Sequence, residues 1–256
     1  MTLADAGLPC GFTAAPDAAS AHGTLGSLAD ALVVCHAAVL AACALQQLAA
    51  PGAPFVVPAL PEVIAAQAPN CGAGPLLYAT TLGLAQLAGL VRLPVAVGIG
   101  ARESAPAGWE AAVDGVFAAT AGALSRASLV VGAGLLDADT YSSTRALMDA
   151  ETFSYAAFCA AGIPVDDETI ALETIAAVGV GGNALGQKHT RRHMKDVWRP
   201  RLFDRAPYEV WERQGRLTAD ERAAALARQL LAEHETPELE AETAATLQRI
   251  IARSGL

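Results

Sequence analysis

Four short runs of apolar residues recur along the first part of the chain, each opened by a proline or a small residue. Each run is followed by a longer stretch with helical spacing. The runs are LPCGFTAA, APFVVPAL, LPVAVGIG and SLVVGAGLL, starting near residues 8, 53, 93 and 128. The predicted helices span roughly residues 24–49, 73–91, 107–124 and 143–161. This alternation predicts an α/β fold with a parallel sheet.

After residue 162 the pattern changes to helices without strands. VDDETIALETIAAV predicts a helix with Asp166 as N-cap and Gly179 as its stop. TADE at 218–221 fits a capping box, and Pro237 predicts the start of a last helix. No low-complexity linker separates this region, so we expect it to pack on the strands and helices before it. The expected parts are a four-unit βα region and a C-terminal helical extension, residues 1–162 and 163–256.

The net charge of the chain limits which classes of partner it can bind. The formal net charge is -9, and the first Lys or Arg of the chain is Arg92. An acidic chain of this kind is a poor general binder of nucleic acid, because neutralising phosphates requires a basic surface. The apolar stretch 31–45 lacks positive flanks, so we expect no membrane span. No positively charged leader opens the chain, which favours a cytoplasmic location.

The number and spacing of the cysteines do not indicate a disulfide framework. There are five, widely spaced and without a C-x-x-C pair. An odd number at such spacing predicts free, buried thiols rather than disulfides or a thiolate zinc site. They are Cys10, Cys35, Cys43, Cys71 and Cys159.

GVGGNALGQKHTRRHM, residues 179–194, holds three motif-like patterns. The glycines follow a predicted helix, whereas a dinucleotide loop must follow a strand. Gln187 separates Gly186 from the lysine, which breaks the phosphate-loop pattern. His189 and His193 have metal-ligand spacing, so a metal hydrolase is one alternative, but two arginines between them repel a cation. We expect no bound metal.

A local excess of positive charge follows. Between residues 187 and 205 there are seven basic residues against Asp196 and Asp204. The alternatives are a site for an anion or an acidic partner, a solvated face, or an internal clamp on helix C-termini. The basic residues are Lys188, Arg191, Arg192, Lys195, Arg199, Arg201 and Arg205.

The stretch GVGGNALGQKHTRRHMKDVWRPRLFDRAPYEVWERQG, residues 179–215, resembles the C-terminal signature of the trimethylamine methyltransferase family. The chain keeps the pattern Gly-x-Gly-Gly-x-x-Leu-Gly-x-x-His-Thr and the following Trp-x-Pro-x-Leu-Phe-Asp-Arg. Weaker resemblance extends upstream through residues 28–57 and 142–155. It covers nearly the whole chain but only the second half of a family member.

The resemblance implies an eight-stranded TIM-type α/β barrel, of which this chain would supply the last four strands. It also implies methyl transfer from a tertiary or quaternary amine to the cobalt of a corrinoid (cobalamin) carried by a partner protein. No cofactor would bind the chain directly. The loop GIGARES lies near the position where the founding trimethylamine enzyme carries pyrrolysine, which this chain lacks. Glycine-betaine-like substrates are therefore favoured over trimethylamine.

Barrel enzymes carry their sites at the carboxyl ends of the strands. The candidate stretches are residues 12–13, 58–62, 98–103 and 132–137. Glu103 would face a cationic amine and Arg102 a substrate carboxylate, with an exposed loop ion pair as the alternative. A quaternary ammonium favours an aromatic cage, and Phe12 alone of these candidates is aromatic. The expected substrate-binding residues are Phe12, Thr13, Gly100, Arg102 and Glu103.

Half of a barrel exposes two strand edges and an apolar inner face. We therefore expect a homo-oligomer or a complementary N-terminal half as partner, in addition to the amine and the corrinoid protein. Few polar residues stand at the strand ends, so a non-catalytic remnant or assembly subunit remains an alternative to an active methyltransferase.

Overall fold

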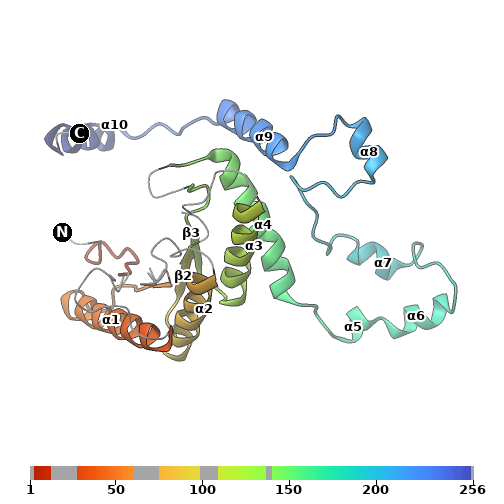
Figure 1. Ribbon diagram of the computed structural model, residues 1–256, viewed down its shortest axis with the longest axis horizontal. Coiled ribbons are helices and arrows are strands. Elements are labelled where there is room, and N and C mark those ends of the chain that lie inside the picture. The colour runs from red at the N-terminus through yellow and green to blue at the C-terminus, as the bar shows by residue number, and fades with distance from the viewer. Residues whose placement is uncertain (1–2, 13–27, 60–74, 99–108, 137–139, 255–256) are drawn as a thin grey trace.

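The chain has an α/β fold built on a small parallel sheet with strand order β1-β2-β3 (Figure 1). The computed structural model describes residues 3–12, 28–59, 75–98, 109–136 and 140–254. The elements are α1 (Leu28–Ala49), β1 (Val57–Ala59), α2 (Pro75–Leu90), β2 (Val95–Gly98), α3 (Trp109–Leu124), β3 (Leu129–Val131), α4 (Ser143–Ala161), α5 (Asp167–Ile170), α6 (Leu172–Val178), α7 (Lys188–His193), α8 (Tyr208–Arg213), α9 (Ala219–Glu233) and α10 (Ala241–Ser254). The predicted α/β class and the four helices between and after the strands are confirmed.

Three of the four predicted strands form the sheet, and the first contributes a parallel bridge at Cys10 to Phe55. The Cys10 N–H donates to Pro54 O at 3.1 Å, and the Val56 N–H donates to Cys10 O at 2.9 Å. A Cβ on Gly11 would lie 2.3 Å from Val56 O, so only glycine permits this approach of the two backbones. The described part of this first segment ends at residue 12.

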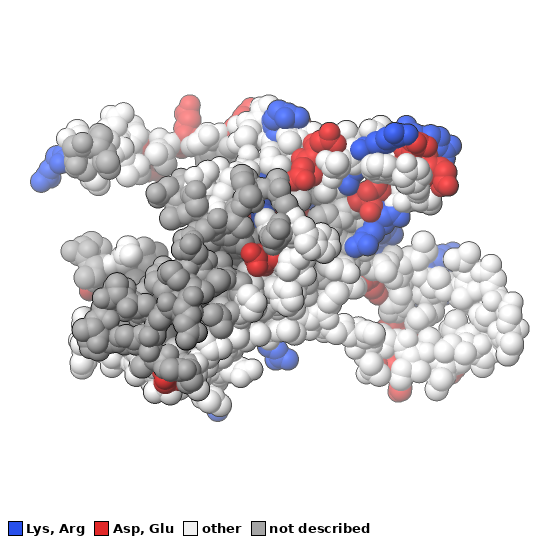
Figure 2. Space-filling view, in the orientation of Figure 1, with Lys and Arg blue, Asp and Glu red and all other residues white. Residues whose placement is uncertain are grey.

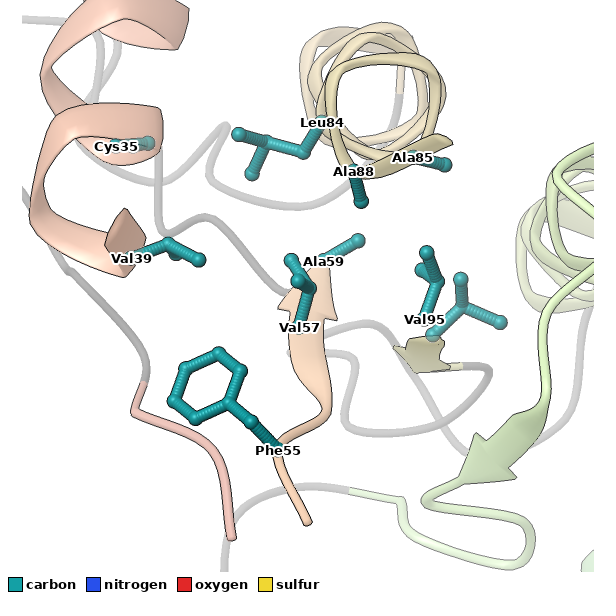
Figure 3. Packing of buried hydrophobic residues seen from close by; sticks show 10 residues of the cluster. Cys35, Val39, Phe55, Val57, Ala59, Leu84, Ala85, Ala88 and Val95 are labelled. Carbon is teal, nitrogen blue, oxygen red and sulfur yellow. The ribbon is translucent and has the colours of Figure 1, made fainter. Parts of the chain in front are cut away.

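The core lies between the sheet and helices α1 and α2 (Figure 3). Alternate strand residues Val57 and Ala59, with Val95 and Val97 beside them, supply the strand side of the core. Small residues on α2 bring that helix close: a Cβ on Gly83 would meet Leu32 at 2.7 Å. The remaining core residues are Cys35, Val39, Phe55, Leu84, Ala85 and Ala88.

Helix α1 ends at Ala49, the predicted last residue, and a turn at Pro51 and Gly52 follows. Gln46 Nε2 donates to Pro54 O at 2.9 Å, Gln47 Nε2 donates to Ala53 O at 2.8 Å, and Gly52 takes a left-handed φ of 83°. By length and composition alone α1 would also cross a membrane, with a mean hydropathy of 2.2, although helices in the cores of soluble proteins meet the same test.

The caps predicted in the C-terminal region are confirmed, but two helix boundaries are not. Asp166 forms a capping box with Thr169, and Thr218 forms one with Glu221. The single helix predicted up to Gly179 is two helices, because Ala171 takes a left-handed φ of 53°. The last helix begins at Ala241 and not beside Pro237.

The C-terminal region touches the rest of the fold chiefly through α9, which packs on α4 with Ala223 and Ala227 buried. Helices α5, α6, α7 and α8 have no buried residues. Residues 163–200, here called the arm, run away from α4 along one side of the molecule (Figure 1). The arm exposes large apolar side chains, among them Ile163, Leu172 and Val180.

Candidate functional site

Most of the predicted site residues lie outside the described part of the chain. Thr13, Gly100, Arg102 and Glu103 all do. Phe12 is described and 55% exposed. It lines an apolar groove of about 650 Å³ between residues 3–12 and the C-terminal half of α1. The structure therefore does not bring the predicted set together among the residues it describes.

A cavity whose mostly apolar wall also holds an ion pair lies between α3 and α4. It has a volume of about 570 Å³ and opens beside the connection that follows β3. The start of α3, the start of α4, the connection and two C-terminal residues all contribute to its wall. Its lining residues are Ala111, Ala112, Gly115, Val116, Leu136, Ser142, Thr144, Arg145, Met148, Asp149, Thr152, Phe203 and Asp220.

An ion pair inside α4 organises this cavity. Arg145 Nε donates to Asp149 Oδ1 at 2.7 Å, and Asp149 is only 4% exposed. Arg145 also donates through Nη2 to the carbonyl of Ala111 at 3.3 Å, and the Gly134 N–H donates to Asp149 Oδ2 at 3.0 Å. A buried carboxylate requires such partners, because an unpaired one costs several kcal/mol. The pair thus ties α3, α4 and the loop after β3 together.

Gly134 is required at its position in that loop. Its φ is 85°, a conformation that favours glycine. A Cβ there would lie 2.6 Å from the Tyr141 ring and 2.8 Å from Ala146. The carbonyl of Gly134 accepts a hydrogen bond from the Ser142 N–H, and Ser142 caps α4 by accepting from the Arg145 N–H. The carboxyl end of β3 and the start of α4 are therefore fixed against each other.

Glu151, two residues after Asp149 on α4, holds the signature segment. Its Oε1 accepts from the backbone N–H groups of Arg201 at 2.6 Å, Leu202 at 3.0 Å and Phe203 at 3.4 Å. From the other side, Arg222 of α9 donates to Leu202 O at 2.6 Å. Leu202 is buried at this junction. The motif Leu-Phe-Asp-Arg is thus clamped between α4 and α9.

Other signature residues pack on the same helix. Trp198 Nε1 donates to Ser154 Oγ at 3.0 Å, and the Trp198 ring lies 4.9 Å from that of Tyr155. The guanidinium of Arg205 sits 5.8 Å from the centre of the Tyr155 ring. These contacts give part of the predicted basic patch a packing role.

The rings of the two histidines of the arm lie against each other at a tilt of 38°, with centroids 4.3 Å apart. His189 Nε2 donates to the carbonyl of Glu168 at 2.9 Å. His193 Nδ1 lies 2.5 Å from Asp196 Oδ2, and its Nε2 is 3.5 Å from Glu168 Oε1, an ionic contact too long for a good hydrogen bond. Within the described residues no group of three His, Cys, Asp or Glu side chains converges to hold a metal ion.

These contacts shift pKa values in the arm. The hydrogen bond to Asp196 raises the pKa of His193, and Glu168 adds to that effect. The Arg192 guanidinium beside Glu168 lowers the pKa of that carboxyl. The Thr169 N–H lowers the pKa of Asp166 in the same way. The first turn of α5 and helix α7 are therefore linked by charge.

Sequence reasoning did not single out Arg145, Asp149 or Glu151. Charged residues on a predicted helix are usually solvated, and nothing local marks these three as buried. The spacing of Arg145 and Asp149, four apart, was the one available signal. Glu151 has its partners some 50 residues away in sequence, so no local pattern reveals it.

Comparison with known proteins identifies the family. The model of trimethylamine methyltransferase (MTTB) matches residues 18–255. The chain is 34% identical over 232 residues to the trimethylamine methyltransferase MttB of Desulfitobacterium hafniense, covering 88% of this chain and 46% of that protein. It is 30% identical over 233 residues to the glycine betaine methyltransferase of the same species, covering 90% and 48%.

A third relative, the trimethylamine methyltransferase MttB of Methanosarcina barkeri, is 29% identical over 226 residues, covering 88% of this chain and 46% of the relative. The chain spans about half the length of the curated relatives it matches. The match includes the signature clamped by Glu151 as well as α3, α4 and the sheet. The chain belongs to the trimethylamine methyltransferase family.

Proposed function

We propose that this chain takes part in methyl transfer from a quaternary amine of the glycine betaine class to a corrinoid on a separate protein. The observation that carries the proposal is the family match over residues 18–255, with relatives that include a glycine betaine methyltransferase. Trimethylamine is disfavoured because the sequence from 98 to 103 holds no pyrrolysine. The partner's corrinoid would supply the nucleophilic cobalt that accepts the methyl group.

The sheet supports a barrel as the scaffold. Its strands are parallel and follow one another in chain order, so every connection moves in the same direction. Right-handed connections of this kind place all the helices on one face, which is the arrangement of an arc of a TIM-type barrel. The strand edges at residue 10 and at β3 would then pair with the other strands of the barrel.

The described residues would serve this reaction by shaping the mouth. Arg145 and Asp149 hold the starts of α3 and α4 at the carboxyl end of β3, where barrel sites lie. Methyl transfer moves positive charge off the amine nitrogen, so a site must hold the cation in a water-poor cavity without trapping it. The predominantly apolar wall of the α3–α4 cavity is suited to that role.

Spectroscopy of a cob(I)alamin mixture tests the proposal. The purified chain is incubated with reduced cobalamin and either glycine betaine or trimethylamine, alone and with the N-terminal half of the Desulfitobacterium hafniense glycine betaine methyltransferase. We expect loss of the cob(I)alamin absorbance with glycine betaine, strongest when the N-terminal half is added. Conversion of trimethylamine but not of glycine betaine would contradict the proposed substrate class.

A second candidate is a non-catalytic assembly subunit of this family. It is favoured by one observation: of the described strand-end residues, only Phe12 is aromatic, which leaves an ammonium cage incomplete in this part of the chain. Absence of conversion with either amine, in the presence of the added half and with the chain folded by circular dichroism, would support it.

A further inference from the structure

Two segments of opposite charge lie apart within one copy of the chain. The basic segment, residues 187–205, carries seven Lys or Arg against two Asp. The acidic segment, residues 233–242, carries five Glu and no Lys or Arg. Figure 1 places α7 and the connection between α9 and α10 on opposite sides of the molecule. Among the described residues no ion pair joins the two segments.

Several basic side chains of the basic segment form no ion pair with the described residues. Arg192 pairs with Glu168, and Arg205 stacks on Tyr155. In the described structure the side chains of Lys188, Arg191 and Lys195 are exposed and make no ion pair. Their spacing, three and then four residues, places them on one side of α7 and the turn after it. They form a single positive strip.

Most carboxylates of the acidic segment also form no ion pair with the described residues. Glu233 accepts a hydrogen bond from Gln229, whereas the other four carboxylates of the segment are exposed and form no ion pair with any described residue. Like charges so close together repel each other, and a positive partner would relieve that repulsion. The four are Glu235, Glu238, Glu240 and Glu242.

Both segments also carry exposed apolar side chains. Val197 of the basic segment is 60% exposed, and Leu239 of the acidic segment is 59% exposed. In Figure 2 the blue and red residues gather mainly over α8 and α9, while α5 and α6 show a largely uncharged surface. An exposed apolar side chain beside complementary charge can be buried when two such segments meet.

We infer that the basic segment of one copy binds the acidic segment of a second copy of this chain. A two-fold axis makes the contact twice, because each copy then offers its basic segment to the acidic segment of the other. The occupant is a second copy because the chain itself supplies the matching charge, with net charges of +5 and -5 on the two segments. This inference concerns assembly and stands whether or not the chain transfers methyl groups.

Charge reversal tests the contact. One variant carries Arg191→Glu and Lys195→Glu, and a second carries Glu238→Lys and Glu240→Lys. Each variant alone introduces two like charges into each contact and reduces the net charge of the altered segment from +5 to +1 or from -5 to -1. We therefore expect its dimerisation to weaken by about tenfold or more at low salt. Mixed in equal amounts, the two variants restore both contacts. We expect a heterodimer of twice the 26.1 kDa chain mass by light scattering.

The matched control for the first variant carries Arg92→Glu and Arg126→Glu, which change the net charge by the same amount but lie outside both segments. We expect it to dimerise like the parent chain. A salt series on the parent chain needs no variant and should weaken dimerisation as salt rises. The inference is overturned by a parent chain that is monomeric at low salt, by dimers that ignore the reversals or the salt, or by a mixture that stays monomeric.

Discussion

Glu151 shows how one side chain can position a segment far away in sequence. A buried carboxylate is costly unless hydrogen bonds replace its water, and here the N–H groups of Arg201 to Phe203 do so. Arg222 engages the Leu202 carbonyl of the same turn. The turn is therefore held through its backbone from both α4 and α9, which explains why a signature segment without regular structure stays in one place.

Replacing this carboxylate should loosen the turn. Glu151→Gln keeps the shape but removes the charge from hydrogen bonds that are each worth about 1.5–3 kcal/mol when charge-assisted. We expect the free energy of unfolding in urea to fall by about 1–3 kcal/mol. Glu173→Gln is the control, since Glu173 is exposed on α6. Equal stability of the two variants would show that Glu151 does not hold the turn.

Gly134 offers a second test at this scale. Gly134→Ala adds a Cβ that would lie 2.6 Å from Tyr141 at a φ of 85°. Gly52→Ala is the matched comparison, because Gly52 has a φ of 83° and no heavy atom within 4 Å of the added Cβ. Backbone strain alone costs about 1–2 kcal/mol, and overpacking adds about 1–3 kcal/mol. The midpoint temperature of thermal unfolding should therefore be lower for Gly134→Ala than for Gly52→Ala. The reverse order would refute the close packing at Gly134.

Local hydrogen bonds made the caps predictable from sequence, whereas long-range contacts hid the polar network. Asp166 and Thr218 bond to residues only three positions away, so the residue types and their spacing suffice. Asp149 and Glu151 are buried by partners on other elements. Their burial depends on the assembled fold, which no short window of sequence contains.

At the scale of elements, the spacing of apolar residues predicted the boundaries of α1 to α4 to within a few residues. It did so because each of these helices packs an apolar stripe on the sheet or on its neighbour. The spacing did not reveal the break at Ala171, since alanine is the strongest helix former. The predicted start of the last helix, at Pro237, also lies before its actual start at Ala241. Glu238 and Glu242 are four apart and would repel each other on one helix face, which disfavours a start beside Pro237.

The link between α5 and α7 should depend on pH. The pKa of His193 is raised by its hydrogen bond to Asp196, and by Glu168. A raised pKa in the folded chain means that the stabilising contact is fully present below the ordinary histidine value of about 6.5. It is lost as pH rises through the folded pKa. We expect the imidazole NMR signals of His193 to titrate above that ordinary value, and amide exchange in α7 to quicken over the same range.

Asp196→Asn supplies the control for that titration. It removes the principal cause of the shift and should bring the His193 midpoint down toward the ordinary value. A His193 midpoint unaffected by the substitution would show that Asp196 does not hold the imidazolium.

Across the whole molecule, burial and charge are distributed very unevenly. The apolar core joins β1 and β2 to α1 and α2, and α4 connects that body to α9. The arm has well-formed caps and turns but exposes large side chains such as Leu172 and Ile175. Local structure without a core of its own is marginally stable in water, because short helices gain most of their stability from packing. The arm thus needs a surface to lie on.

Hydrogen exchange distinguishes the body from the arm. Amides of β1, β2 and α2 should exchange slowly in every variant, since their opening requires loss of the core. Amides of α7 should be slow only where the basic and acidic segments meet between copies, and fast in the variant carrying Arg191→Glu and Lys195→Glu. The mixed reversal variants should regain the slow exchange. If α7 exchanged equally fast in the parent dimer and in the reversed monomer, the interface would have to lie on another surface, because a segment buried between copies cannot open without separating them.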